Sequence, residues 1–297
     1  MADPRRSVPR PRKEHNDNEP RVKAEDLYNP HDVCEGAVEY VLRNVNTVQY
    51  IIKSIEEITG NPFQRDRIKC LPLVPHGGAA HDAEGLTPDR VLAGYIWRSA
   101  RADCTAKDIV LLEDHIIRQF SAKHAEAFLK KKGVGPKRDG STPSSSSSAP
   151  FGETLSTSTQ LLQLLLVESQ QPVLRQVERN IRHELIHAFD DARGIVESSD
   201  CLHQACSEVR AARLSGDCFV GQEMRKGRFN FFEGGQKCVR RLAVMAVERN
   251  PVCRGFSERA VDTVMPKCYS DYEPFAAPVY ALGSYGETQF PNATLKL

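Results

Sequence analysis

Apolar residues recur at intervals of three and four along much of the chain, which is the spacing of one face of an α-helix. One such stripe covers residues 36–58, and the Gly-Asn-Pro sequence at 60–62 predicts its end. Four more helices are predicted in the second half of the chain, at about 172–193, 200–215, 234–249 and 256–266. The pattern therefore predicts a mainly α fold, with α+β as the alternative.

Polar stretches without such a stripe divide the chain. Residues 1–30 contain five prolines and hardly any apolar side chain, and five consecutive serines occur at 144–148. Neither composition buries enough apolar surface to offset the entropy lost on ordering. We expect a disordered arm at 1–30, followed at 31–129 by the N-terminal part of the folded domain, which contains an irregular insertion. A Ser/Pro-rich flexible insertion follows at 130–160, then the core of the domain at 161–280 and a C-terminal tail at 281–297.

The chain is almost electrically balanced, with 40 Lys and Arg against 39 Asp and Glu and a formal net charge of +1. A protein that binds nucleic acid without sequence preference needs an excess of positive charge to displace the counterions of the phosphates. We therefore expect no nucleic-acid partner. The sequence also contains no run of the roughly 18–20 apolar residues that span a bilayer, so we expect the chain not to cross a membrane by itself.

The helix predicted at 172–193 carries the sequence HELIH at 183–187, which matches the H-E-x-x-H metal-binding pattern. Four residues advance a helix by about 400°, so His183 and His187 lie one turn apart on the same face and can bind one zinc ion. Glu184 lies beside them, where it can take a proton from a water molecule rather than bind the metal. The alternative is that both histidines are ordinary polar positions of a helix.

A catalytic zinc site usually has three protein ligands, so the sequence should supply a third. We predict Glu208, on the next helix, in preference to His203. These two residues are five positions apart, about 140° around a regular helix, and cannot both face the metal. Asp190 and Asp191 follow His187 by three and four residues, which suits an orienting contact to an imidazole N–H better than a role as ligand.

The residues around this pattern resemble a known family. HELIHAFDDAR at 183–193, HQACSEVRAARLSGDC at 203–218, NPVC at 250–253 and DYEPF at 271–275 are similar to the mitochondrial inner-membrane zinc protease family that processes and helps assemble the ATP synthase. The resemblance implies a zincin-like metalloprotease domain with Zn²⁺ as cofactor and a disulfide-linked helical C-terminal half. It makes 31–129 and 161–280 parts of one protease domain.

The resemblance also implies a substrate and a location. Members of the family mature the precursor of the ATP synthase a subunit and chaperone the assembly of the enzyme. They are peripheral proteins of the mitochondrial inner membrane on the side of the intermembrane space. Two alternatives remain open for this chain: a non-proteolytic assembly chaperone whose zinc site is incidental, and a nuclear DNA-repair partner protein.

The nine cysteines include no C-x-x-C pair, and the gaps between the last six suit bridges between helices better than a structural zinc site. Because the number of cysteines is odd, at least one of them stays outside any set of intramolecular disulfides. The family resemblance places the chain in a compartment that forms disulfides, and makes Cys34, Cys70 or Cys104 the expected odd thiol. It further indicates a short strand at 109–112 and an inserted region at 79–108.

Overall fold

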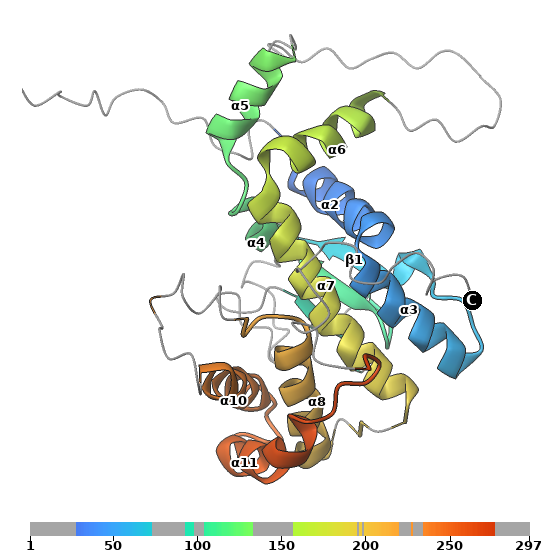
Figure 1. Cartoon of the computed structure of the whole chain (residues 1–297), viewed down its shortest axis with the longest axis vertical. Helices are drawn as coiled ribbons and strands as arrows, with labels where there is room; N and C mark the ends of the chain where they lie inside the picture. The colour runs from blue at the N-terminus through green and yellow to red at the C-terminus, as the bar shows by residue number, and fades with distance from the viewer. Residues whose placement is uncertain are drawn as a thin grey trace, which may run out of the picture.

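The computed structural model describes residues 28–72, 93–97, 104–132, 157–194, 196–197, 199–219, 227 and 234–276. The predicted tail at 281–297, most of the predicted arm at 1–30 and most of the insertions at 79–108 and 130–160 lie outside the described residues. The elements, labelled in Figure 1, are α2 (Pro30–Asn44), α3 (Asn46–Thr59), the 3₁₀ turn η1 (Arg65–Arg67), β1 (Ile68–Leu71), β2 (Ala93–Tyr95), β3 (Ile109–Leu112), α4 (Glu113–Ile117), α5 (Ala122–Lys131), α6 (Thr157–Ser169), α7 (Gln171–Ala192), α8 (Cys201–Leu214), α10 (Gly234–Val247) and α11 (Ser257–Cys268).

The described residues are mostly helical and include one small sheet, which confirms the predicted fold class. The single helix predicted over 36–58 is wrong, because Val45 has an extended backbone (φ −104°, ψ 102°) and separates α2 from α3. The side-chain amide of Gln49 donates to the carbonyl oxygens of Leu42 (3.1 Å) and Arg43 (2.7 Å), which the break leaves without helical partners. Periodicity carries no sign of this break, since the apolar residues of both helices face the same core.

The sheet has three strands in the order β1-β3-β2. The central strand β3 runs parallel to β1, with Ile68 opposite Ile109, and antiparallel to β2, with Tyr95 opposite Ile109. All four residues of β3 are apolar and buried, as expected of a central strand covered on both faces. The strand that the family resemblance indicates at 109–112 is therefore present.

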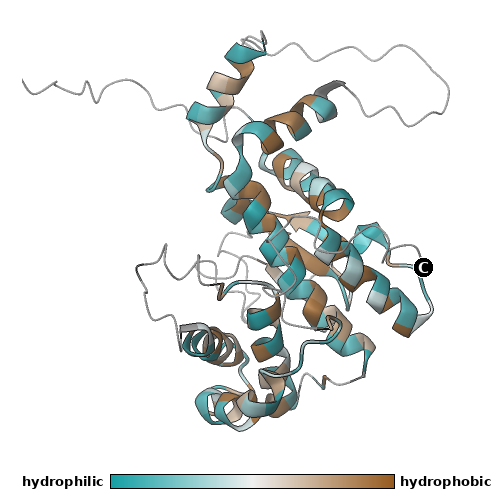
Figure 2. Cartoon of the chain, viewed as in Figure 1, coloured by the Kyte–Doolittle hydropathy of each residue, from teal (hydrophilic) through white to brown (hydrophobic). Residues whose placement is uncertain are grey.

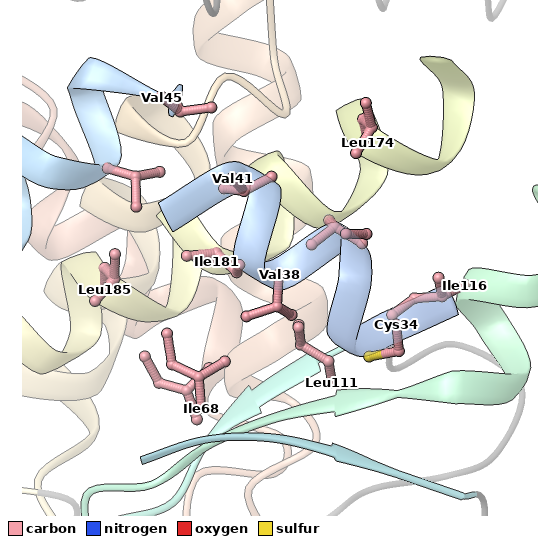
Figure 3. Packing of buried hydrophobic residues seen from close by; sticks show 14 of the residues in the cluster. Cys34, Val38, Val41, Val45, Ile68, Leu111, Ile116, Leu174, Ile181 and Leu185 are labelled. Carbon is pink, nitrogen blue, oxygen red and sulfur yellow. The ribbon is translucent and has the colours of Figure 1, made fainter. Parts of the chain in front are cut away.

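The main core lies between this sheet and the helices α2, α3 and α7. Figure 3 shows Val38 and Val41 of α2 with Ile181 and Leu185 of α7 above Ile68 and Leu111 of the sheet. Apolar and polar residues alternate along most of the helical ribbons in Figure 2, the pattern of helices that have one buried face. This core fixes α7, the helix that carries the HELIH sequence.

Helix α6 was not predicted, because its leucines surround the helix instead of forming one stripe. Leu165 and Leu166 are buried in the main core, whereas Leu164 remains exposed. Gly36 of α2 faces this helix, and a side chain there would approach Leu162 to 3.1 Å. Glycine at position 36 thus allows α2 and α6 to pack closely.

A second hydrophobic cluster joins α8, α10 and α11, which lie together at one end of the molecule (Figure 1). Three disulfides hold these helices and the segments between them: Cys201–Cys253, Cys206–Cys268 and Cys218–Cys238. A fourth disulfide, Cys34–Cys70, joins α2 to β1, and Cys104 remains as the odd, buried cysteine. The predicted disulfide-linked C-terminal half is confirmed.

Native protein alkylated before reduction should therefore carry no label on the six C-terminal cysteines, and digestion should release the three linked peptide pairs named above. Reductant should also lower the melting temperature, because each bond restricts the unfolded chain and contributes about 2–4 kcal/mol. Mass spectrometry and thermal unfolding measure the two effects. Alkylation of all six cysteines in folded protein would contradict the disulfide pairing.

Candidate metal centre

Helix α7 places the HELIH residues. Pro172 stands in its first turn, and Gly194, with φ +70°, follows its end, in agreement with the predicted start and stop. The apolar face of α7 lies in the main core. The adjacent face, which carries His183 and His187, packs against α8. The two imidazole centroids are 5.0 Å apart. The sequence-based expectation that both rings share one side of the helix agrees with this geometry.

Helix α8 brings the third candidate ligand. The carboxylate of its N-cap Asp200 accepts from the backbone N–H groups of Leu202 and His203. Two turns further on, the carboxylate of Glu208 lies 3.6 Å from Nε2 of His183 and 3.7 Å from Nε2 of His187. One ligand atom from each of these three residues lies within 4.8 Å of the other two.

His203, the competing candidate, lies away from this cluster. Its side chain is 47% exposed, and its Nδ1 accepts a hydrogen bond from the backbone N–H of Glu197 at 3.3 Å. The structure therefore brings Glu208, and not His203, to the two imidazoles. The rotation between positions 203 and 208 on one helix accounts for this choice.

The other ring nitrogen of each histidine has a partner that the sequence did not indicate. Nδ1 of His183 lies 3.1 Å from a carboxylate oxygen of Asp217, which is next to a disulfide-bonded cysteine. Nδ1 of His187 lies 2.8 Å from the hydroxyl of Ser207. Both Nδ1 atoms are thus engaged on the outer side, and both Nε2 atoms face Glu208. This is the arrangement in which outer contacts orient metal-binding imidazoles.

Asp190 contacts an imidazole only indirectly. The hydroxyl of Ser207 donates to Asp190 at 2.9 Å, and the Arg210 guanidinium donates to both oxygens of the same carboxylate at 3.0 and 3.2 Å. The expected direct contact of Asp190 with an imidazole is therefore wrong, because Ser207 stands between them. Asp191 instead accepts from the Tyr95 hydroxyl at 2.8 Å.

Glu184 is buried beside this cluster, with 6% of its surface exposed. Burial raises the pKa of its carboxyl group to about 7; the charge of His183 opposes this rise and that of Glu208 adds to it. The backbone N–H of Tyr95, on strand β2, also contacts the carboxylate and favours its charged form. Glu184 is therefore a buried carboxyl group next to the histidines, and its pKa lies close to neutral pH.

The electrostatics of the cluster favour a cation. Burial opposes protonation of His183, but hydrogen bonds with Asp217 and Glu208 raise its pKa well above the usual value. Burial opposes ionisation of Glu208, but the hydrogen bond and the charge of His183 hold its pKa below the usual value. Burial lowers the pKa of His187 to about 4, which leaves this imidazole neutral and able to act as a ligand. Two imidazoles and one carboxylate are also a donor set that zinc accepts.

Aromatic side chains from the sheet edge adjoin the cluster. The Trp97 ring lies 6.0 Å from the His187 ring, centroid to centroid, and packs edge-on against Tyr95 at 4.8 Å. Tyr95 ends β2 and Trp97 follows it by two residues, both inside the region that the sequence indicated as an irregular insertion. Only the paired strand brings them to α7.

Two histidines one turn apart on a helix, with a glutamate between them and a carboxylate on a second helix, form an arrangement that is typical of metallopeptidases. Comparison with known proteins agrees with this class. Residues 144–276 match the Peptidase M76 family. The match includes HELIH and Glu208, and it confirms the resemblance inferred from the sequence.

The chain is also similar to curated relatives named mitochondrial inner membrane protease ATP23. It is 46% identical to that of Lodderomyces elongisporus over 103 residues (34% of this chain, 43% of the relative) and 42% identical to that of Eremothecium gossypii over 118 residues (38% and 48%). It is 38% identical to that of Schizosaccharomyces pombe over 115 residues (38% and 62%). The matched segments span about half the length of these relatives. No solved structure matches the chain, so the zincin-like fold remains a prediction.

The contact between α7 and α8 can be tested through its buried ion pair. Arg210→Met keeps an apolar stem but leaves the Asp190 carboxylate buried without its cation, which should cost about 3–5 kcal/mol of unfolding free energy. Arg240→Met, the matched control, removes a pair with Asp262 whose two side chains are about half exposed and should cost less than about 1 kcal/mol. Urea unfolding of the oxidised chain measures both, and equal losses would contradict this account of the pair.

Proposed function

We propose that the chain is a zinc-dependent endopeptidase whose metal is held by His183, His187 and Glu208. The observation that carries this proposal is the convergence of the three side chains on one point, with the buried carboxyl group of Glu184 beside them. The similarity of residues 144–276 to a peptidase family supports it independently.

Zinc suits these donors because catalytic zinc sites use three protein ligands, such as two imidazoles and one carboxylate, and leave a fourth position for water or substrate. When bound there, it would polarise the scissile carbonyl group and lower the pKa of a water molecule. The chain's own residues do the rest. His183, His187 and Glu208 would hold the metal, and Glu184 would take the proton of the attacking water and pass it to the leaving amine. Burial of Glu184 keeps bulk water away from this proton transfer.

The substrate would be a mitochondrial precursor protein, for which the family resemblance points to the precursor of the ATP synthase a subunit. The relatives are named as proteases of the mitochondrial inner membrane. Four disulfides support a place in the oxidising intermembrane space, since reducing compartments rarely keep such bonds. In the part of the chain that the structure describes, no helix has both the length and the apolar character needed to cross a bilayer. We propose peripheral association with the inner membrane.

Zinc content tests the metal site. The full chain should hold one zinc per molecule, and His183→Ala and His187→Ala should each lose it, because two remaining protein ligands bind zinc poorly. Glu208→Ala should weaken binding as well, whereas His203→Ala, on the same helix, serves as the control and should leave it unchanged. Elemental analysis after dialysis gives the result. Undiminished zinc in both histidine variants would exclude this site.

Glu184→Gln separates chemistry from metal binding. The amide has nearly the shape of the carboxylate but cannot take up the proton, so zinc should stay and cleavage of the a-subunit precursor should fall by at least about 100-fold. Precursor cleavage with purified protein and ATP synthase assembly in complemented cells provide the two readouts. Cleavage by Glu184→Gln at the wild-type rate would overturn the role of Glu184. Retained assembly without cleavage would assign assembly to a separate, non-proteolytic activity.

A further inference from the structure

Ser207 has two polar partners and only one proton. Its hydroxyl oxygen lies 2.8 Å from Nδ1 of His187 and 2.9 Å from a carboxylate oxygen of Asp190. The side chains of all three residues are buried, so water does not replace either contact. The number of protons available therefore fixes the direction of both hydrogen bonds.

Burial raises the pKa of the Asp190 carboxyl group to about 6 against the opposing charge of Arg210, so at neutral pH the group is ionised. The carboxylate then accepts from the Arg210 guanidinium through both oxygens and has no proton to give. The Ser207 hydroxyl must therefore donate to Asp190. Because its one proton is used there, its oxygen can only accept from His187, which requires a proton on Nδ1 of that ring. A neutral imidazole with its proton on Nδ1 has its lone pair on Nε2, the atom that faces Glu208.

We propose that Ser207 is a positioning residue, which fixes the His187 imidazole in the Nδ1–H form and presents Nε2 to the metal. This inference rests on the proposed zinc site. Ser207 holds the ring through a hydroxyl group, whereas Asp217 holds the His183 ring directly through a carboxylate.

The placement of Ser207 adds a second effect. It precedes Glu208 on α8, so one short segment supplies both a candidate ligand and the group that orients another ligand. Arg210, one turn further along, fixes the same segment to α7 through Asp190. Any sliding of α8 along α7 would therefore disturb Glu208 and His187 together, which makes the site sensitive to the register of the two helices.

The tautomer of His187 tests the proposal without metal. In nitrogen-15 NMR of the metal-free full chain, the two ring nitrogens of His187 should show the chemical-shift pattern of an imidazole with its proton on Nδ1. A His187→Gln variant assigns these signals. Ser207→Ala should mix this pattern with the Nε2–H form, and Ser207→Thr, which keeps the hydroxyl, should restore it. An unmixed Nδ1–H pattern in Ser207→Ala would overturn the proposal.

Zinc affinity provides the second readout, measured by competition with a chelator. Ser207→Ala should bind zinc about 10–100-fold more weakly, the usual effect of removing a group that orients a metal ligand. Ser257→Ala is the matched control, because Ser257 is an equally buried serine that donates to the carboxylate of Glu248, away from any imidazole. It should lose comparable thermal stability but keep its zinc affinity within about twofold.

The possible failures can be told apart. If the wild-type chain binds no zinc, the proposed function fails, while the tautomer measurement still decides the role of Ser207. If the wild type binds zinc and Ser207→Ala binds it equally well, only the positioning role fails. Equal losses of zinc affinity in the Ser207 and Ser257 variants would show a general loss of stability and would also overturn the proposal.

Discussion

The buried ion pair between Asp190 of α7 and Arg210 of α8 is the constraint on which the site depends. Both side chains are almost fully buried, so neither charge tolerates loss of the other. Arg210 also forms an ion pair with the Asp271 carboxylate through Nη1, and its Nη2 donates to the backbone carbonyl of Glu273. Apolar packing alone would allow α7 and α8 to slide, whereas the charge pair has one favourable register. In that register Glu208 faces the imidazoles of α7.

The two sides of this pair are stabilised by different means. Helix α7 is held by the apolar core that it forms with α2, α3 and the sheet. Helix α8 belongs to the smaller cluster, where the disulfides of Cys201 and Cys206 tie it to the segments at Cys253 and Cys268. A small core gains stability from such bonds because they restrict the unfolded chain. The candidate metal site thus lies where a core stabilised by burial meets a helical unit stabilised by disulfide bonds.

The features that could be predicted from the sequence are those set by a periodic pattern or by residues close together in the chain. The ends of α7, α8, α10 and α11 fall within two residues of the predicted ones, because each helix has one apolar face. HELIH fixes its own geometry within one helical turn. The contacts of Ser207 and Asp217, the place of Trp97 and the break at Val45 depend on how separate segments pack, and residue spacing carries no record of that. One sequence feature could have indicated the contact of Asp217 with His183. Asp217 precedes Cys218, whose disulfide fixes this segment next to the histidine.

The composition of the site also explains why metal binding and folding should support each other. Three acidic side chains, Glu184, Glu208 and Asp217, lie around His183 and His187 in a largely buried space. Burying several carboxylates costs free energy unless positive charge compensates them, and in this cluster a proton on His183 is the nearest source. A divalent cation would supply that charge at the point where the ligand atoms converge. Since the unfolded chain lacks the site, a metal ion bound there would stabilise the folded state.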